Sequence, residues 1–265
     1  MKKIIGFILL FCITTIQAQE KDFVLGKIAT LKSTVLNEDR KLNIYFPAGY
    51  DATTSYPVIY LLDGSADQDF IHIVGIVQFA NYDWINMLSK SIVVGIENVD
   101  RRRDFTFPTT IEKDKQDFPT TGGSEKFITF LEKELQPYIE QKYKTTASKT
   151  IIGQSLGGLL ATEILFKMPR LFTNYIIVSP SIWWNKQSLF AVAPEFANTN
   201  FNQKTKVFIS VGKEGSVMEK DAKKLYEMVK KNGKSIDSHF HYFNDSSHAD
   251  ILHLAVYKAF ETLKI

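Results

Sequence analysis

The sequence predicts an α/β fold in which a mostly parallel, doubly wound sheet carries an antiparallel hairpin at its N-terminal edge. Residues 28–36 and 40–46 form two extended runs separated by Asn37-Glu38-Asp39, a pattern that is typical of a hairpin. From residue 57 onward, short apolar runs alternate with longer segments whose apolar residues recur at helical spacing. This alternation indicates parallel strands joined by crossover helices.

The individual elements follow from these patterns in chain order. Residues 47–55 contain turn formers and small polar residues without an apolar period, so we expect a loop there. The expected buried strands are residues 57–62, 91–96, 151–152, 175–178, 207–211 and 239–243. The expected helices are residues 74–88, 127–139, 156–167, 218–231 and 250–263.

Two longer irregular segments, residues 97–124 and 179–205, follow expected strands. Both leave the carboxyl ends of those strands, which is where open α/β sheets bind ligands. The second segment is long enough for only a few helical turns. We therefore expect no large lid domain and an open or shallow cleft.

Residues 1–18 have the features of a secretory signal peptide, since Lys2-Lys3 precedes an apolar run and the segment ends at Ala18. This predicts an exported protein, periplasmic or secreted. The apolar run is too short to span a bilayer, and no later stretch approaches twenty apolar residues, so no membrane span is expected. Cys12 is the only cysteine, and its removal with the signal peptide would exclude disulfides, cysteine nucleophiles and thiolate metal sites.

Residues 19–265 are expected to form a single domain, because they contain no internal repeat, low-complexity tract or linker. The formal net charge of +3 falls to about +1 when Lys2 and Lys3 are removed (3 minus 2), so charge does not favour nucleic acid as a partner. The sequence contains neither a glycine-rich phosphate loop nor a cluster of histidines and carboxylates at metal-ligand spacing. We expect no cofactor and no metal. The oligomeric state is left open.

A strand, a sharp turn and a helix meet at residues 150–161, where the sequence contains Gly153-Gln154-Ser155-Leu156-Gly157. A turn this tight brings neighbouring backbone close, so Gly153 and Gly157 suit it because they have no Cβ. The turn exposes the Ser155 hydroxyl at the carboxyl end of the sheet. Ser155 is therefore the candidate nucleophile, and the Leu156 amide is a candidate oxyanion donor.

An activated serine needs a base and a third group that orients the base. His248 lies in a polar loop after the last expected strand and is the candidate base, whereas the other four histidines, His72, His239, His241 and His253, have positions that suit structural roles. Glu214 follows the penultimate strand and is the favoured acid. Glu219 and Asp221 are alternatives on the following helix. The second oxyanion donor is expected to be the amide of Gly64 or Ser65, after residues 57–62.

Several motifs are spread over nearly the whole of residues 19–265: Tyr60-Leu61-Leu62-Asp63-Gly64, Val94-Gly95-Ile96 with Asn98, Asp100-Arg101-Arg102-Arg103-Asp104, Gly122-Gly123 with Phe127 and Phe130-Leu131, Gly153-Gln154-Ser155-Leu156-Gly157-Gly158, and Ser179-Pro180-Ser181-Ile182-Trp183-Trp184. Together they resemble the esterase D and enterochelin (siderophore) esterase-like group of α/β-hydrolases. The resemblance implies that Ser155 is the nucleophile, with His248 and Glu214 as its partners. It also implies a small-molecule ester substrate from among siderophores, aromatic esters and acylated sugars.

The function predicted on these grounds is that of an exported serine esterase, cofactor-free, which forms an acyl-enzyme on Ser155. One alternative is an acyltransferase that uses the same triad, and another is a non-catalytic siderophore- or glycan-binding protein on the same fold. Arg101 and Arg103 match positions of the family motif, and arginine pairs with anionic oxygens and stacks on aromatic rings. With Trp183 and Trp184 they are the candidate substrate-binding residues, whereas Arg102 can equally be a solvated surface residue.

Overall fold

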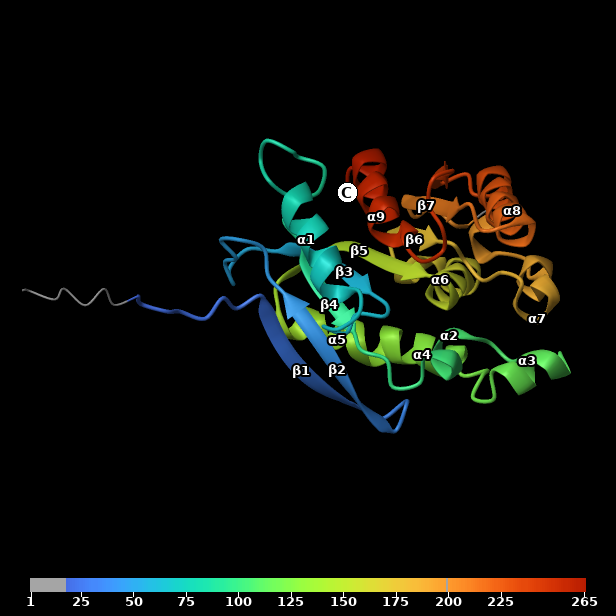
Figure 1. The fold of residues 1–265 in the computed structure, drawn as a ribbon, viewed down its shortest axis with the longest axis horizontal. Coiled ribbons are helices and arrows are strands. Elements are labelled where there is room, and N and C mark those ends of the chain that lie inside the picture. The colour runs from blue at the N-terminus through green and yellow to red at the C-terminus, as the bar shows by residue number, and fades with distance from the viewer. Residues whose placement is uncertain (1–17, 199) are drawn as a thin grey trace, which may run out of the picture.

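The computed structural model describes residues 18–198 and 200–265 of the chain. These residues form an eight-stranded sheet with helices packed on both faces (Figure 1). The predicted signal peptide, residues 1–18, lies outside the described residues except for Ala18. No helix within the described part of the chain combines the length and the apolarity that a membrane crossing requires.

The strand order of the sheet is β1-β2-β4-β3-β5-β6-β7-β8. The strands are β1 (Gly26–Ser33), β2 (Glu38–Tyr45), β3 (Tyr56–Leu61), β4 (Ile92–Ile96), β5 (Thr145–Gln154), β6 (Asn174–Val178), β7 (Thr205–Gly212) and β8 (Ile236–Phe243). The β1–β2 hairpin is antiparallel and pairs with β4, and all later pairs are parallel. Because β4 and β5 lie on opposite sides of β3, the chain reverses direction there, and a crevice at the carboxyl ends of β3 and β5 is the expected ligand site of such a sheet.

The two faces of the sheet carry different helices. The helices are α1 (Phe70–Ala80), α2 (Arg101–Phe105), α3 (Glu112–Asp117), α4 (Ser124–Phe130), α5 (Gln136–Lys142), α6 (Leu156–Lys167), α7 (Trp184–Gln187), α8 (Ser216–Asn232) and α9 (Ile251–Leu263), with a π turn, η1 (Leu131–Leu135), between α4 and α5. Short 3₁₀ turns are η2 (Pro169–Leu171), η3 (Ser188–Ala191) and η4 (Glu195–Ala197). Helices α1 and α9 pack together on one face, and α4, α5 and α6 lie on the other (Figure 1).

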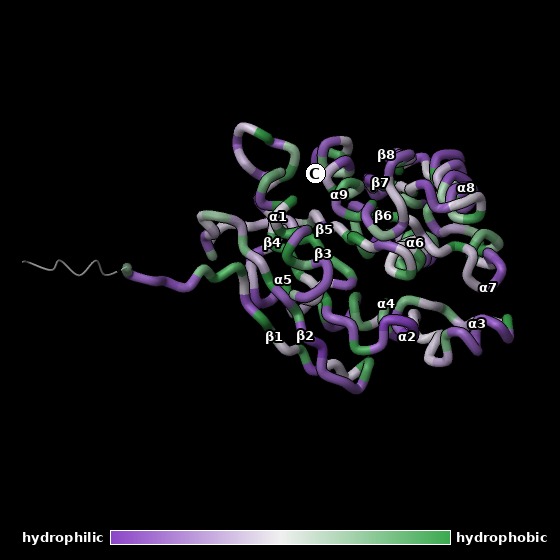
Figure 2. The backbone as a smooth tube through the Cα atoms, viewed as in Figure 1, coloured by the Kyte–Doolittle hydropathy of each residue, from purple (hydrophilic) through white to green (hydrophobic). Residues whose placement is uncertain are grey.

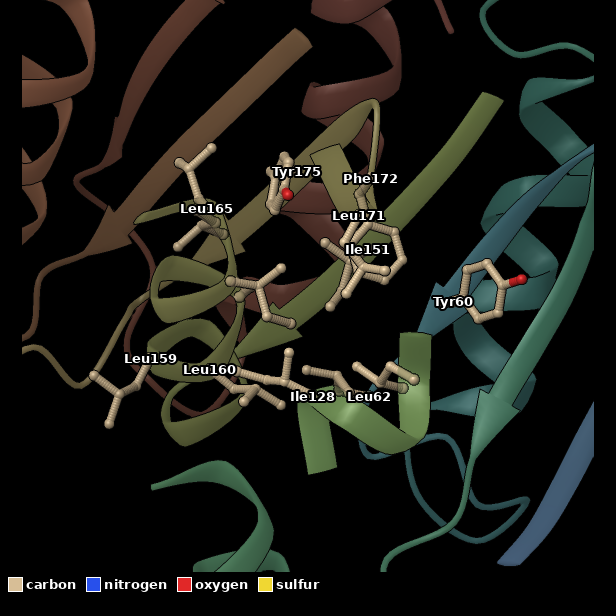
Figure 3. Close-up of a cluster of buried hydrophobic side chains, with 14 of the residues drawn as sticks. Tyr60, Leu62, Ile128, Ile151, Leu159, Leu160, Leu165, Leu171, Phe172 and Tyr175 are labelled. Atoms are coloured by element: carbon tan, nitrogen blue, oxygen red, sulfur yellow. The ribbon is translucent and has the colours of Figure 1, made fainter. Parts of the chain in front are cut away.

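Alternation along the strands builds two apolar cores, one on each face of the sheet. Tyr60 and Ile151 point to the larger core with α6, whereas Ile59 and Ile152 point to the core with α1 and α9. Both faces are buried, so the strands read as continuous apolar runs. Figure 3 shows side chains of β3, β5 and α6 meeting in the larger core. The hydrophobic stretches lie mainly in the middle of the molecule, and hydrophilic stretches lie mainly at its periphery (Figure 2).

The predicted fold class is confirmed by the parallel sheet and the N-terminal hairpin, and the described residues contain no large lid domain. Two element predictions differ from the structure. The helix predicted over residues 74–88 is α1, which ends at Ala80 because the following turn folds back and the amides of Met87 and Leu88 donate to the Ala80 carbonyl. Residues 97–124, expected to be irregular, contain α2 and α3, which are too short for helical periodicity to reveal them.

Candidate active site

Ser155 stands at a strained turn between β5 and α6. Its backbone dihedrals are φ 60° and ψ −118°, a conformation that non-glycine residues rarely adopt. A Cβ on Gly153 would lie 2.4 Å from the Gly157 carbonyl oxygen, so this glycine is required by the close approach of the chain. A Cβ on Gly157 would meet only ordinary contacts of 3.5 Å or more. The expected need for two glycines therefore holds in the structure for Gly153 and not for Gly157.

Residues 178–181, which leave β6, fix the turn from the other side. The Ser155 amide donates to the Val178 carbonyl at 3.0 Å, and the Ser181 amide donates to the Ser155 carbonyl at 3.0 Å. The hydroxyl oxygens of Ser155 and Ser181 are 3.3 Å apart. A Cβ on Gly158 would lie 2.9 Å from the Val178 carbonyl oxygen, so α6 can approach this segment only with glycine there. The second required glycine is thus Gly158.

Glu214 and His248 form the second part of the site. Glu214 follows β7 and has a 2 % exposed side chain, while His248 lies in the loop after β8 with a 46 % exposed side chain. The Nδ1 atom of His248 is 2.5 Å from Oε2 of Glu214. With Nδ1 engaged by Glu214, Nε2 is the ring nitrogen of His248 that can face a nucleophile.

The other carboxylate oxygen of Glu214 is also bonded. Its Oε1 accepts from the Ser179 hydroxyl at 2.5 Å and from the Gly212 amide at 2.8 Å. Burial raises the pKa of Glu214, but the hydrogen bonds from His248, Ser179 and Gly212 outweigh it and hold the pKa below its usual value. The carboxylate is therefore ionised at neutral pH.

The two alternative acids have other partners. Oε1 of Glu219 accepts from the amides of Glu214 and Gly215 at 3.1 and 3.0 Å, so this side chain holds the loop at the start of α8. Asp221 is buried and accepts from Gln187 Nε2 at 2.9 Å. Of the three acids considered, Glu214 is the one that contacts His248.

The candidate oxyanion donors differ in whether their backbone amide already donates a hydrogen bond within the protein. Leu156 is the first residue of α6, where backbone N–H groups have no partner within the helix. The Gly64 amide donates to the Ile96 carbonyl at 3.0 Å, so it cannot serve a substrate, and the expectation for Gly64 is corrected. Gly64 instead lets the loop pass β4, since a Cβ there would lie 2.3 Å from the Cα of Gly95. Ser65 stays the candidate for the second donor.

Arg101 forms an ion pair with the loop that carries Ser65. Its Nε and Nη2 atoms donate to the two carboxylate oxygens of Asp63 at 2.6 and 2.9 Å. Asp63 has a φ of 54°, and it also accepts from Asn98 at 2.6 Å. Nη2 of Arg101 lies 3.3 Å from the Gln154 carbonyl oxygen. Arg101 thus connects the loop after β3 with the residue that precedes Ser155.

Ser155 and His248 open into two neighbouring hollows of about 420 and 460 Å³. We name the hollow of about 420 Å³ the Asp69 hollow; its other lining residues are Asp63, Gln68, Asp69, Arg101 and Gln154. We name the hollow of about 460 Å³ the Lys213 hollow; its other lining residues are Ser181, Trp183, Lys213, Glu214 and Met218. A substrate bound at Ser155 can therefore extend to either side of it.

Two of the four predicted substrate-binding residues line these hollows, Arg101 and Trp183. Trp184 does not, because it is fully buried and its Nε1 donates to the Phe107 carbonyl at 2.8 Å. Arg103 does not either, because it pairs with Asp104 and Glu38. It lines a separate hollow beside α4. We correct the expectations for Trp184 and Arg103 accordingly.

Sequence reasoning missed several residues of the site: Ser179, Ser181, Gln68, Asp69, Lys213 and Met218. Ser179 and Ser181 belong to a motif that was recognised, but their roles depend on contacts with Glu214 and Ser155, far away in sequence. Lys213 could have been found as the neighbour of Glu214 in the same loop. Within residues 18–198 and 200–265, no three histidine, cysteine or acidic side chains are grouped so that they could hold a metal ion.

Comparisons with known proteins place the chain among esterases. The model of the esterase family, described as "Putative esterase", matches residues 33–250. The ferri-bacillibactin esterase BesA of Bacillus subtilis is 31% identical over 244 residues, which cover 84% of each chain. An IroE-like serine hydrolase from Shewanella oneidensis is 28% identical with a TM-score of 0.81, covering 90% of this chain and 79% of that one.

A second solved structure, the BES protein from Bacillus cereus, is 30% identical with a TM-score of 0.80 and covers 94% of this chain and 98% of that chain. The family match begins at the end of β1, includes the Ser155 turn and Glu214, and reaches past His248. The chain therefore belongs to the esterase family, in its siderophore esterase-like group of α/β-hydrolases, and is a serine hydrolase that acts on ester bonds.

Proposed function

We propose that the protein hydrolyses its ester through an acyl-enzyme on Ser155, with His248 as the base and Glu214 as the group that orients His248. The observation that carries this proposal is that Ser155 and His248 line the same two hollows, while Nδ1 of His248 is bonded to Glu214. Nδ1 of His248 donates to the ionised Glu214, which leaves Nε2 to accept the Ser155 proton.

In the first half-reaction, Oγ of Ser155 attacks the ester carbonyl carbon while Nε2 of His248 takes its proton. The amides of Leu156 and Ser65 donate to the oxyanion, because Leu156 opens α6 and Ser65 follows β3. The bond from the carbonyl carbon to the alcohol oxygen then breaks, and the alcohol leaves with the proton from His248. In the second half-reaction, water attacks the acyl carbonyl carbon while His248 takes its proton. The bond to Oγ of Ser155 then breaks, the acid is released, and the proton returns from His248 to Ser155.

We propose a siderophore ester as the substrate. Support comes from a relative that matches 84% of the chain, a ferri-bacillibactin esterase. A triacetylfusarinine C esterase of Aspergillus fumigatus, 38% identical over 80 residues, adds to it. The two hollows give room on both sides of Ser155 for a substrate larger than a simple acyl ester.

We also propose that residues 1–18 are removed during export to the periplasm or the medium, and that residues 19–265 act as a single domain. Support comes from the charged and apolar composition of residues 1–18. The continuous sheet from β1 to β8 supports a single domain. Mass determination of the exported protein checks the cleavage site, and an N-terminus other than residue 19 contradicts it.

The test of the catalytic proposal is Ser155→Ala. Removal of a triad nucleophile should lower kcat for p-nitrophenyl acetate and for a ferric siderophore ester on the order of 10⁶-fold, while the circular dichroism spectrum and Tm stay close to those of the wild type. The matched control is Ser246→Ala, a buried serine on the His248 loop that lines neither hollow. Retained turnover in Ser155→Ala would remove Ser155 from the mechanism.

Product analysis with an added alcohol distinguishes the two enzymatic outcomes. We expect the free acid as the main product, because both hollows are open to water at Ser155. A transferred acyl ester as the main product would identify an acyltransferase. Stoichiometric binding of the siderophore without turnover would identify a binding protein.

A further inference from the structure

The contact with Glu214 sets how the His248 ring is turned, but it does not set how far His248 lies from Ser155. Glu214 belongs to the loop after β7, whereas Ser155 stands at the turn after β5. A base accepts a proton only from a group within hydrogen-bond reach. The distance of His248 from the end of β5 is therefore as important as the orientation of its ring.

The loop that carries His248 spans residues 244–250, between β8 and α9. On the side of β7, the Lys213 amide donates to the Ser246 carbonyl at 2.7 Å. On the side of β5, Nε2 of Gln154 donates to the main-chain carbonyl oxygen of His248 at 2.5 Å. The side chain of Gln154 therefore joins the loop of the candidate base to the strand that leads to the nucleophile.

The alternation of side chains along β5 explains why Gln154 reaches this loop. Ile152 packs in the core with α1 and α9, and Gln154, two residues further on, points to the same face of the sheet. Residues 244–250 lead directly into α9, which covers that face. The strand periodicity of β5 thus brings the amide group of Gln154 to the main chain of His248.

The backbone of Gln154 is itself held, so its side chain extends from a fixed point. Gln154 is the last residue of β5 and lies opposite Val178 of β6 in the strand register. Its carbonyl oxygen accepts from Nη2 of Arg101 at 3.3 Å. The next residue in the chain is Ser155, so one peptide bond separates the residue that holds His248 from the nucleophile.

The bond from Gln154 holds His248 without occupying its ring. The His248 side chain is 46 % exposed, so packing fixes its position only in part and hydrogen bonds contribute the rest. The acceptor is the main-chain carbonyl, so Nδ1 stays with Glu214 and Nε2 can still face the nucleophile.

We propose that Gln154 is a positioning residue for His248, because its side-chain amide sets the distance between the imidazole and Ser155. Glu214 orients the ring, and Gln154 fixes the main chain that carries the ring. This inference rests on the proposed catalytic mechanism. It adds to that mechanism a residue that acts through His248 and takes no part in the bond changes.

The test is Gln154→Met, which keeps the length of the side chain and removes the donor. With p-nitrophenyl acetate we expect kcat to fall about tenfold, since a small displacement of a catalytic group is enough to slow the reaction. KM should stay within about twofold of the wild type, because His248 serves both half-reactions and both slow together. Gln154→His supplies an N–H donor of similar reach and should recover most of kcat.

The matched control is Gln78→Met, which replaces an exposed glutamine on α1 that lines neither hollow, and its kcat should equal that of the wild type. Unchanged kcat in Gln154→Met would overturn the positioning role. A higher KM with constant kcat would also overturn it and make Gln154 a substrate contact. An equal loss of kcat in Gln154→Met and Gln154→His would attribute the effect to side-chain shape rather than to the donor.

A measurement without turnover separates this inference from the catalytic proposal. In the Ser155→Ala background, Gln154→Met should speed amide hydrogen exchange at residues 247–249 about tenfold, whereas Gln78→Met should not change it. Faster exchange, together with retained turnover in Ser155→Ala itself, would support the link between Gln154 and His248 and sink the acyl-enzyme mechanism. Loss of turnover in Ser155→Ala, with exchange and kcat unaffected by Gln154→Met, would do the reverse.

Discussion

In the proposed mechanism, Glu214 is the residue that orients His248. Both of its carboxylate oxygens are committed, one to His248 and the other to Ser179 and Gly212. Buried charges are tolerated only when they are bonded in this way. In the proposed mechanism, the carboxylate holds the imidazole in one tautomer and stabilises the imidazolium that would form during turnover.

Replacing Glu214 by Gln should lower kcat on the order of 10⁴-fold, because the amide can present an N–H to His248 and favour the wrong tautomer. The matched control is Asp221→Asn, whose remaining oxygen still accepts from Gln187, and we expect its kcat within about twofold of the wild type. Steady-state kinetics with p-nitrophenyl acetate measure both. The reverse ranking would assign the role to Asp221.

Ser179 is a positioning residue for Glu214. It is buried and strained, with a φ of 45°, and its hydroxyl is 2.5 Å from Oε1 of the carboxylate. Ser179→Ala removes one charged hydrogen bond, so we expect kcat to fall about tenfold with KM unchanged. Ser179→Cys, which keeps a weak donor, should recover part of kcat. A rise in KM with constant kcat would show that Ser179 shapes substrate binding instead.

At the scale of elements, the site is assembled where the loops after β3, β5, β6, β7 and β8 meet. The strand order reverses at β3, so the loop with Asp63 lies beside the turn with Ser155. Arg101, from α2, bonds both of these segments, which places one side chain between the candidate oxyanion loop and the nucleophile. The arginine is thus a clamp between elements as well as part of the wall of the Asp69 hollow.

Arg101→Ala should therefore lower kcat for small and large esters alike, about tenfold or more, because the Ser65 amide loses its support whatever the substrate. Arg101→Lys should restore little of it, since lysine cannot form the paired contact with Asp63. Arg102→Ala, at the exposed neighbouring position, is the control. A change confined to KM of an anionic ester would mean that Arg101 binds substrate directly.

At the scale of the whole molecule, the site is maintained at some expense of stability. Burial raises the pKa of Asp69 to about 6, with a further increase from the charge of Asp63 that Arg101 partly offsets. Since this pKa lies above the ordinary value of 3.8, the folded chain binds the proton more tightly than the unfolded chain. The ionised carboxylate therefore destabilises the fold, fully above about pH 6 and not below about pH 4.

Asp69→Asn should raise the free energy of unfolding by about 1 to 3 kcal/mol at pH 7.5 and leave it unchanged at pH 4. Urea denaturation at the two pH values measures the difference. Asp67→Asn, at an exposed position of the same loop, should show no such pH dependence. A gain of the same size at both pH values would attribute the effect to packing rather than to charge.

The sequence alone determined those features that depend on neighbours in the chain. Apolar runs of strand length and helical spacing depend on local side-chain periodicity, so the parallel sheet and the β1–β2 hairpin could be predicted before any contact was known. The turn at Ser155 could also be predicted, because the five residues from Gly153 to Gly157 contain its whole pattern. Glu214 and His248 were predicted from chain order, since each follows a strand at the same edge of the sheet.

Only the tertiary structure decided which groups are already engaged by distant partners. The Gly64 amide is taken by Ile96, the Trp184 side chain is buried against Phe107, and Arg103 pairs with Glu38 across the fold. Each of these contacts joins segments far apart in the sequence, so no local pattern encodes it. The bond from Gln154 to His248 is likewise a matter of what surrounds Gln154, because a glutamine at the end of a strand has the same sequence signal with or without an acceptor in reach.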